Sequence, residues 1–261
     1  MNLDLSNKHA LVCGSSQGIG RATAITLSKM GAKITLLARD EKKLAKVSQE
    51  LDAKNGQKHN YECVDFNCTK SLKEVINNII AGEGVDVLIN NTGGPPSGPI
   101  LSASEKDFED AFKMHVICNQ ILTQAIVPEM KKKNFGRIVN VISTSVKIPI
   151  PNLGVSNTIR GAVASWAKTM ANELGVHGIT VNNVLPGFTN TNRLKSLIEQ
   201  KSIKTGFTQE KVVSTMHQQI PANRFGSADE VANAIAFLCS PAASYINGIN
   251  LPVDGGRTGS L

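Results

Sequence analysis

The chain has 261 residues, of which 41% are hydrophobic and 4% aromatic, and lysine plus arginine (28) exceed aspartate plus glutamate (21). This length suffices for one α/β domain with a sizeable core, and no apolar run is long enough to predict a membrane span. The positive charges stand in short lysine groups typical of solvated helix faces, and aromatic residues are too few for base stacking, so we expect neither a nucleic-acid nor a membrane partner.

Short aliphatic segments alternate with longer amphipathic segments along the whole chain. Strands are predicted, in chain order, at residues 9–13, 33–37, 61–64, 85–89, 137–141, 179–183 and 249–251. Helices are predicted at residues 20–30, 41–53, 71–81, 105–130 and 155–174. This alternation predicts an α/β fold with a single doubly wound parallel sheet of Rossmann type and helices on both faces. The polar stretch 193–223 departs from the alternation, and we expect it to form a substrate lid within one domain spanning 1–261.

A glycine-rich turn follows the first predicted strand and opens the first helix. In this position backbone N–H groups and the helix dipole point toward a bound anion, such as the pyrophosphate of a dinucleotide. A tight turn made only for packing is the alternative. The candidate cofactor-binding residues are Gly14, Ser15, Ser16, Gln17, Gly18, Ile19 and Gly20.

The end of the second predicted strand bears on the choice between NADP and NAD. A carboxylate there would bind the free ribose 2′-hydroxyl of NAD, whereas an arginine and small hydroxyls suit the 2′-phosphate of NADP. Ala38 and Arg39 occupy this position, with Ser15 and Ser16 across the turn, so NADP is favoured over NAD. Asp40 permits a second interpretation as the ribose ligand, although it would more simply cap the helix that follows.

The five cysteines are odd in number and widely spaced, which favours buried free thiols over disulfides or a zinc site. We therefore predict no bound metal. The first residues, Met1 to Leu5, lack the basic and apolar regions of a signal peptide, so we expect a cytoplasmic protein.

From residue 8 to residue 256 these motifs resemble the short-chain dehydrogenase/reductase family. The resemblance rests on the Gly-x-x-x-Gly-x-Gly turn, on Asn-Asn-Thr-Gly at 90–93, on Pro-Gly followed by Thr191, and on the closing segment 252–256. It implies an oxidoreductase for small carbonyl or alcohol substrates that forms a homodimer or homotetramer. It also implies further cofactor-binding residues, namely Asp65, Phe66, Asn90, Asn91, Gly93, Arg160, Pro186, Gly187, Thr189 and Thr191. Asp65 has an alternative role as the cap of the next helix.

The catalytic positions implied by the resemblance are altered. The family serine is kept as Ser143, but the tyrosine and lysine positions hold Ser156 and Arg160, and His115 stands at the helical asparagine position. A serine hydroxyl is a poor general acid, and an arginine does not exchange protons near neutral pH. An imidazole can do so, unless His115 is a buried structural histidine.

Two functions follow from this altered site. In the first, an NADP-dependent reductase holds a carbonyl group with Ser143, Ser156 and Arg160, while His115 or a water supplies the proton. In the second, the protein binds the dinucleotide without efficient hydride transfer and acts as a sensor or scaffold. Asn-Thr-Gly-Gly-Pro-Pro together with Ser-Asn-x-x-Arg resembles a subgroup likened to the 3-oxoacyl-acyl-carrier-protein reductases, and this favours the first function.

Overall fold

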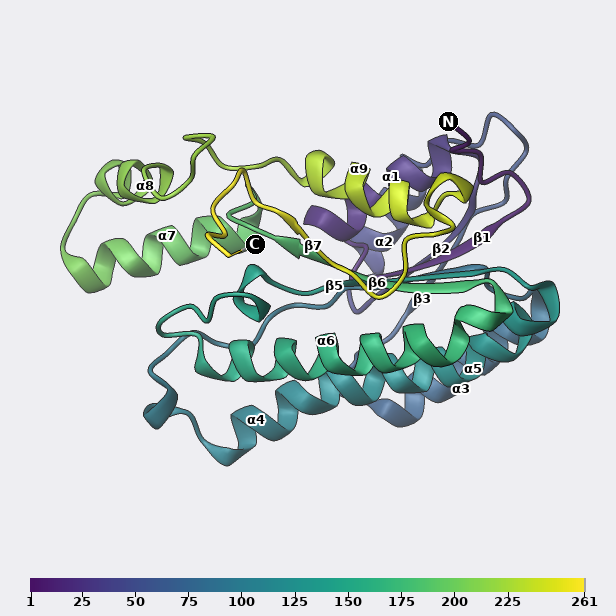
Figure 1. Cartoon of the computed structure of the whole chain (residues 1–261), viewed down its shortest axis with the longest axis horizontal. Coiled ribbons are helices and arrows are strands. Elements are labelled where there is room, and N and C mark those ends of the chain that lie inside the picture. The colour runs from purple at the N-terminus through teal and green to yellow at the C-terminus, as the bar shows by residue number, and fades with distance from the viewer. Residues whose placement is uncertain (261) are drawn as a thin grey trace.

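A sheet of seven parallel strands forms the centre of the computed structural model, which describes residues 1–260 (Figure 1). The strand order is β3-β2-β1-β4-β5-β6-β7, which confirms the predicted doubly wound parallel sheet. The strands are β1 (His9–Cys13), β2 (Lys33–Ala38), β3 (Asn60–Cys63), β4 (Val87–Asn90), β5 (Gly136–Val141), β6 (Ile179–Pro186) and β7 (Asn250–Val253).

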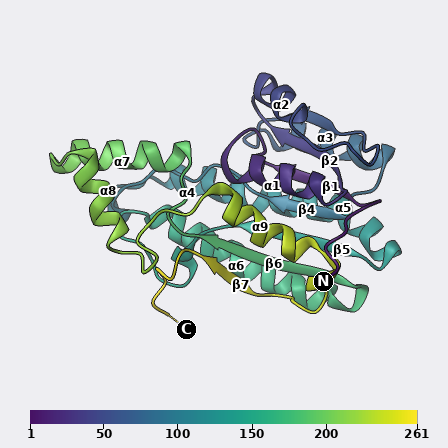
Figure 2. The same cartoon turned by 90° about the horizontal axis from the view of Figure 1, so that it is seen from above.

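Helices cover both faces of this sheet. Helices α1, α2 and α9 lie on one face and α3, α4, α5 and α6 on the other, while α7 and α8 extend beyond the sheet (Figures 1 and 2). Their bounds are α1 (Gly18–Lys29), α2 (Glu41–Ser48), α3 (Thr69–Gly82), α4 (Glu105–Phe112), α5 (Cys118–Lys133), α6 (Gly154–Leu174), α7 (Asn192–Thr205), α8 (Gln209–His217) and α9 (Ala228–Cys239).

The two faces of the sheet carry separate hydrophobic clusters. Side chains of a strand point alternately to the two faces, so β1 sends Val12 into the cluster under α1 and α9 and Leu11 into the cluster over α3 and α5. Ile89 and Leu88 of β4 divide in the same way. Burial on both faces explains why these strands read as continuous aliphatic runs.

Four asparagines form a side-chain ladder across β4, β5, β6 and β7. The Nδ2 of Asn90 donates to Oδ1 of Asn140 (2.9 Å), Asn140 donates to Asn183 (2.9 Å), and Asn183 donates to Asn250 (2.8 Å). The residues are direct neighbours in the strand register. Because each step satisfies a polar group inside the sheet, the ladder fixes how these four strands align beneath the candidate site.

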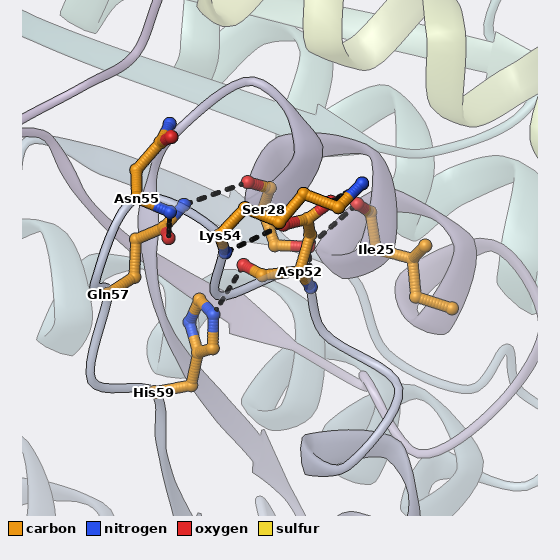
Figure 3. Close-up of polar contacts among 7 residues, drawn as sticks. All are labelled: Ile25, Ser28, Asp52, Lys54, Asn55, Gln57 and His59. Atoms are coloured by element: carbon orange, nitrogen blue, oxygen red, sulfur yellow. Dashed lines mark hydrogen bonds and ion pairs between the residues drawn. The ribbon is translucent and has the colours of Figure 1, made fainter.

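Polar contacts fasten the connection between α2 and β3 to the last turn of α1 (Figure 3). Ser28 accepts a hydrogen bond from the backbone N–H of Asp52 (3.0 Å), and its carbonyl accepts one from Gln57 (3.1 Å). His59 Nε2 lies 2.9 Å from the carbonyl oxygen of Asp52. The helix predicted to reach residue 53 therefore ends at Ser48, and the following loop packs at the end of α1 away from the glycine turn.

The expectation that the cysteines are buried is corrected in part. All five cysteines are free thiols, but Cys63 and Cys68 are exposed because they lie on the edge strand β3 and in the loop after it; only Cys13, Cys118 and Cys239 are buried. Within residues 1–260, no helix is long and apolar enough to cross a membrane. No group of three histidine, cysteine or acidic side chains in that range is arranged to hold a metal ion.

Candidate functional site

The glycine turn after β1 has no room for a side chain at Gly14 or Gly20. Gly14 has φ +60°, and a Cβ placed there would stand 2.4 Å from the carbonyl oxygen of Asn91. A Cβ at Gly20 would stand 2.3 Å from the carbonyl oxygen of Gly14. Helix α1 starts at Gly18 without a side-chain cap, so its first N–H groups are available to an anion. The turn is thus built for close approach of a phosphate group.

Three distant segments meet at this turn. The Nδ2 of Asn91, directly after β4, donates to the carbonyl oxygens of Cys13 and Gly14 (3.3 Å each). Thr191, directly before α7, has its methyl group 3.5 Å from where a Cβ of Gly18 would stand. The structure therefore brings together the predicted cofactor residues of the first turn, of the segment after β4 and of the segment after β6.

The hydroxyl of Ser15 has a structural role that differs from our expectation. Ser15 is fully buried, and its Oγ accepts a hydrogen bond from the backbone N–H of Leu37 (2.9 Å). Its side chain ties β2 to the turn, so it does not point toward a 2′-phosphate. Ser16, the next residue, is only partly buried.

Arg39 is the exposed charged group at the end of β2. The carboxylate of Asp40 accepts a hydrogen bond from the backbone N–H of Lys43 (3.1 Å) and caps α2, which confirms the capping interpretation of Asp40. With this carboxylate engaged at the helix end, the end of β2 carries an exposed cation.

The segment after β3 is folded into a side-chain turn. Oδ1 of Asp65 accepts hydrogen bonds from the backbone N–H (2.9 Å) and side-chain amide (3.0 Å) of Asn67, directly before α3. Asp65 is exposed. The side chain of Phe66 packs in the hydrophobic core, so a cofactor contact at this residue would have to come from its backbone.

The segment after β6 forms a compact turn. Gly187 adjoins the carboxyl-terminal segment so closely that a Cβ would stand 2.6 Å from the Cβ of Asp254. The hydroxyl of Thr189 donates to the carbonyl oxygen of Gly187 (3.2 Å), and that of Thr191 donates to the carbonyl oxygen of Thr189 (3.3 Å). Pro186 ends the strand, so all four predicted residues of this segment lie in one turn beside the glycine turn.

Ser143 and Arg160 lie at the exit of β5. Ser143 Oγ accepts a hydrogen bond from the backbone N–H of Ser145 (3.1 Å), which leaves the hydroxyl proton of Ser143 free to donate. Arg160, on α6, donates from Nη1 to the carbonyl oxygen of Val141 (2.9 Å), the last residue of β5. Ser156 lies one helical turn before Arg160 on the same face of α6, and its hydroxyl makes no hydrogen bond with residues 1–260.

The environment of Arg160 lacks negative charge. Its side chain is buried, with the residue 8% exposed, and its Nε has no partner among residues 1–260. Burial, and secondarily the charge of Arg193, lower the pKa of Arg160 to about 10. The guanidinium therefore stays cationic at neutral pH, although no carboxylate supports it.

His115 lies in a π-helical turn, Lys113–Ile117, which divides the single helix predicted at 105–130 into α4 and α5. Its Nδ1 hydrogen bonds with Oγ1 of Thr92 (2.7 Å), and its Nε2 is buried without a partner among residues 1–260. Burial and the charge of Arg160 lower the pKa of His115 to about 2, and a backbone contact with Gly93 opposes this shift only in part. The ring is thus neutral near pH 7, which is unfavourable for the proton-donor role expected from the sequence.

Sequence reasoning missed two residues at this site, Thr92 and Arg193. Both act on the proline-rich loop after β4: Thr92 bonds to His115, and Nη2 of Arg193 donates to the carbonyl oxygen of Pro95 (2.9 Å). A third contact joins the N–H of Gly98 to the carbonyl oxygen of Asn152 (2.8 Å). The only signal in the sequence was the stiffness of the loop, because its partners are distant along the chain.

A cavity of about 280 Å³ lies next to the segment that carries Ser143. Thr144, the residue after Ser143, contributes to its wall. The full lining is Thr144, Ile148, Pro149, Ile150, Pro151, Gln219, Arg257 and Thr258. A larger hollow of about 630 Å³ is lined by residues of α8, by Gln218 and by Asn223, all within the stretch 193–223 that was predicted to form the lid.

Sequence comparison relates the chain to known oxidoreductases. Residues 14–258 match the family described as enoyl-(acyl carrier protein) reductase. The chain is 33% identical to a 3-oxoacyl-acyl-carrier-protein reductase of Aquifex aeolicus, over 98% of this chain and 99% of that protein. It is 31% identical to gluconate 5-dehydrogenase of Gluconobacter oxydans, over 98% of this chain and 97% of that protein.

Solved structures agree with these relationships. The L-sorbose reductase of Gluconobacter frateurii, complexed with NADPH and L-sorbose, has a TM-score of 0.93 and 28% identity over the whole of both chains. YwfH, an NADPH-dependent reductase involved in bacilysin biosynthesis, has a TM-score of 0.92 and 28% identity over 97% of this chain and 99% of that one.

Proposed function

Since the chain belongs to the short-chain dehydrogenase/reductase family, we propose that it is an NADP-dependent oxidoreductase that reduces a carbonyl substrate, in the manner of a 3-oxoacyl reductase. The observation that carries the proposal is the glycine turn, which Asn91 holds open for a phosphate. The named relatives are reductases and dehydrogenases, which supports the same class of reaction.

NADP is proposed over NAD because Arg39 is exposed at the end of β2 while the nearby Asp40 caps α2. The two solved relatives described above are an NADPH complex and an NADPH-dependent enzyme, in agreement with this choice. Fluorescence titration with NADPH and NADH tests it. We expect Arg39→Ala to weaken NADPH binding at least ~10-fold and to leave NADH binding nearly unchanged, because only NADPH carries the 2′-phosphate. Equal weakening of both would contradict the assignment.

The bound cofactor would supply the hydride. On the protein side, Ser143 keeps a hydroxyl proton free to donate to the carbonyl oxygen of the substrate. Ser156 offers a second hydroxyl from the face of α6 that carries Arg160. The guanidinium of Arg160 would stabilise negative charge that develops on that oxygen, because a buried charge acts through a low effective dielectric constant.

Proton supply is the step in which this site differs from the family pattern. The pKa of His115 lies near 2, and a serine hydroxyl is a weak acid, so neither side chain is a good donor at neutral pH. We therefore propose that a water oriented by Ser143 and Ser156 supplies the proton, that the nearby cation of Arg160 makes this water more acidic, and that the hydroxide left behind exchanges with bulk solvent. His115 then serves as a neutral side chain that holds Thr92 and the loop after β4.

A second candidate function is a cofactor-binding sensor or scaffold without turnover. The absence of a side chain with a near-neutral pKa at the catalytic positions favours it. A panel of ketones and 3-oxo esters, tested with NADPH in excess of enzyme, separates the two. Oxidation of NADPH by any member supports the reductase, while tight NADPH binding without oxidation across the panel supports the sensor.

Further proposals concern the whole chain. We propose that residues 193–223, which include α7 and α8, act as the substrate lid, and that the protein is cytoplasmic. We also propose a homodimer or homotetramer formed through the helices at 105–130 and 155–174. Phe112 and Ile117, which are 43% and 39% exposed, lie on the first of these and would be covered by a partner. Sedimentation equilibrium measures the assembly directly.

A further inference from the structure

Two arginines approach the same loop from opposite elements. Arg160 comes from α6, and a Cβ placed at Gly94 would stand 3.8 Å from its Nη2. Arg193 comes from the first turn of α7, and its Nη2 donates to the carbonyl oxygen of Pro95. The guanidinium groups of buried Arg160 and exposed Arg193 therefore lie beside adjacent residues of one loop, and Gly94 adds no side chain next to Arg160.

No acidic side chain compensates this pair. Within residues 1–260, neither arginine takes part in an ion pair, and the only charged group that shifts the pKa of Arg160 is Arg193. Burying a guanidinium without a counter-charge is unfavourable, so buried arginines are normally paired with a carboxylate or phosphate. The free protein thus holds positive charge that it does not neutralise itself.

Arg137, which is also buried, without an ion pair and with an unpartnered Nε among residues 1–260, has more contacts with the protein than Arg160. Its Nη1 donates to the carbonyl oxygens of Gly136 (2.8 Å) and Gly178 (3.1 Å), and its guanidinium stacks on the ring of Phe135 at 4.4 Å. Arg160 has a single protein hydrogen bond, to Val141, and no ring contact within residues 1–260. Its remaining donors are left for a ligand.

We propose that Arg160 and Arg193 form an oxyanion-binding subsite, so that the substrate carries a carboxylate or phosphate group in addition to its carbonyl group. This inference rests on the proposed reductase function, which it deepens by naming the substrate class. A planar guanidinium binds either anion through two parallel hydrogen bonds, and a second cation nearby adds to the attraction. A neutral analogue would leave the charges uncompensated.

Paired probes test the subsite without requiring turnover. Acetoacetate is compared with methyl acetoacetate, and dihydroxyacetone phosphate with dihydroxyacetone, each titrated into the NADP-saturated protein and followed by ligand-observed NMR. We expect the charged member of one pair to bind at least ~10-fold more tightly than its neutral partner, because an unpaired buried charge penalises the neutral compound. The pair that discriminates identifies the anion as carboxylate or phosphate.

Two substitutions, each with a control variant, test whether Arg160 and Arg193 cause the preference for the charged probe. Gly94→Asp puts a carboxylate beside Nη2 of Arg160 and should abolish the preference for the charged probe, whereas Gly94→Asn, of the same size, should retain it. Arg193→Gln should reduce the preference at least ~5-fold, because one of the two cations is lost. Lys195→Gln, which removes an exposed cation from the same helix, is the control and should leave the preference unchanged.

The outcomes separate the subsite from the reductase function. Three outcomes would overturn the subsite: equal binding within both pairs, no binding by either charged probe, or identical behaviour of Gly94→Asp and Gly94→Asn. In each case, turnover of a neutral ketone would still support the reductase function. Discrimination that disappears in Gly94→Asp, without NADPH oxidation by any of the four probes, would support the subsite while counting against their reduction.

Discussion

At the scale of single residues, the most consequential feature is the buried guanidinium of Arg160, which has no acidic side chain as a counter-ion. Arg160 is 8% exposed and donates one hydrogen bond to Val141. The resemblance to the family implies a lysine at this position and a tyrosine at the position of Ser156. With a serine there, a lysine at position 160 would have no neighbouring tyrosine whose pKa it could lower. The guanidinium of Arg160 stays charged and has several N–H donors in fixed directions, so it can bind an anion.

Arg160→Met tests whether this charge serves function more than stability. We expect the free energy of unfolding to change by less than about 1 kcal/mol or to increase, because the variant removes a buried unpaired charge while keeping side-chain volume. Turnover should fall at least ~10²-fold, because charge stabilisation of the substrate oxygen is lost. Urea denaturation and steady-state kinetics measure the two effects. Destabilisation by more than about 3 kcal/mol would show that Arg160 is mainly structural.

The buried His115 leads to a prediction about how protein stability depends on pH. Its pKa in the folded protein, about 2, lies below the ordinary value of 6.5, so between these values the unfolded chain binds more protons. Its contribution to stability is therefore complete above about pH 6.5 and declines as the pH falls. At pH 5 the loss is about 2 kcal/mol relative to pH 7. Denaturation of His115→Asn at both pH values should show a smaller loss, by roughly this amount.

The pH profile of turnover provides an independent test of the same residue. Because the ring stays neutral, we expect kcat/KM of the wild type and of His115→Asn to share one pH profile between pH 5.5 and 8. A titration in that range that is present in the wild type and missing in His115→Asn would restore the proton-donor role.

At the scale of secondary-structure elements, the strands were predictable because each buried strand is an aliphatic run bounded by turns. Other features were not, because they depend on contacts between distant segments. The asparagine ladder joins side chains from four strands that meet only in the sheet. The π-helical turn around His115 shifts the register of one helix without changing its apolar spacing. Arg193 was assigned only to a lid, since its partner Pro95 is 98 positions away.

The ladder yields a prediction about unequal stability effects. Asn140 lies inside it, so Asn140→Ala leaves the donor of Asn90 and the acceptor of Asn183 unpaired and should cost about 2–4 kcal/mol. Asn250 lies at its end and is partly exposed, so Asn250→Ala should cost about 1 kcal/mol. Chemical denaturation of both variants measures the difference. Equal costs would mean that the ladder does not act as a connected unit.

At the scale of the whole molecule, the fold collects the candidate site from segments far apart in sequence. The glycine turn, the loop after β4, the exit of β5 and the start of α7 come into contact through Asn91, Arg160, Thr191 and Arg193. The segments expected to bind the cofactor could be named from their sequence motifs, and the structure brings three of them together at the glycine turn. The catalytic side was predictable only as a set of altered residues, because the charge, burial and partners of those residues depend on tertiary packing.

The reaction proposed for this protein is hydride transfer from NADPH to a carbonyl carbon. The most direct measurement is incubation with NADPH deuterated at the transferable position, together with acetoacetate or an acetoacetyl thioester, followed by NMR of the product. We predict deuterium on the new carbinol carbon in the wild type, and at least ~10²-fold slower labelling in Ser143→Ala, which lacks the hydroxyl that polarises the carbonyl group. Tight binding of NADPH without label in any alcohol product would contradict the account.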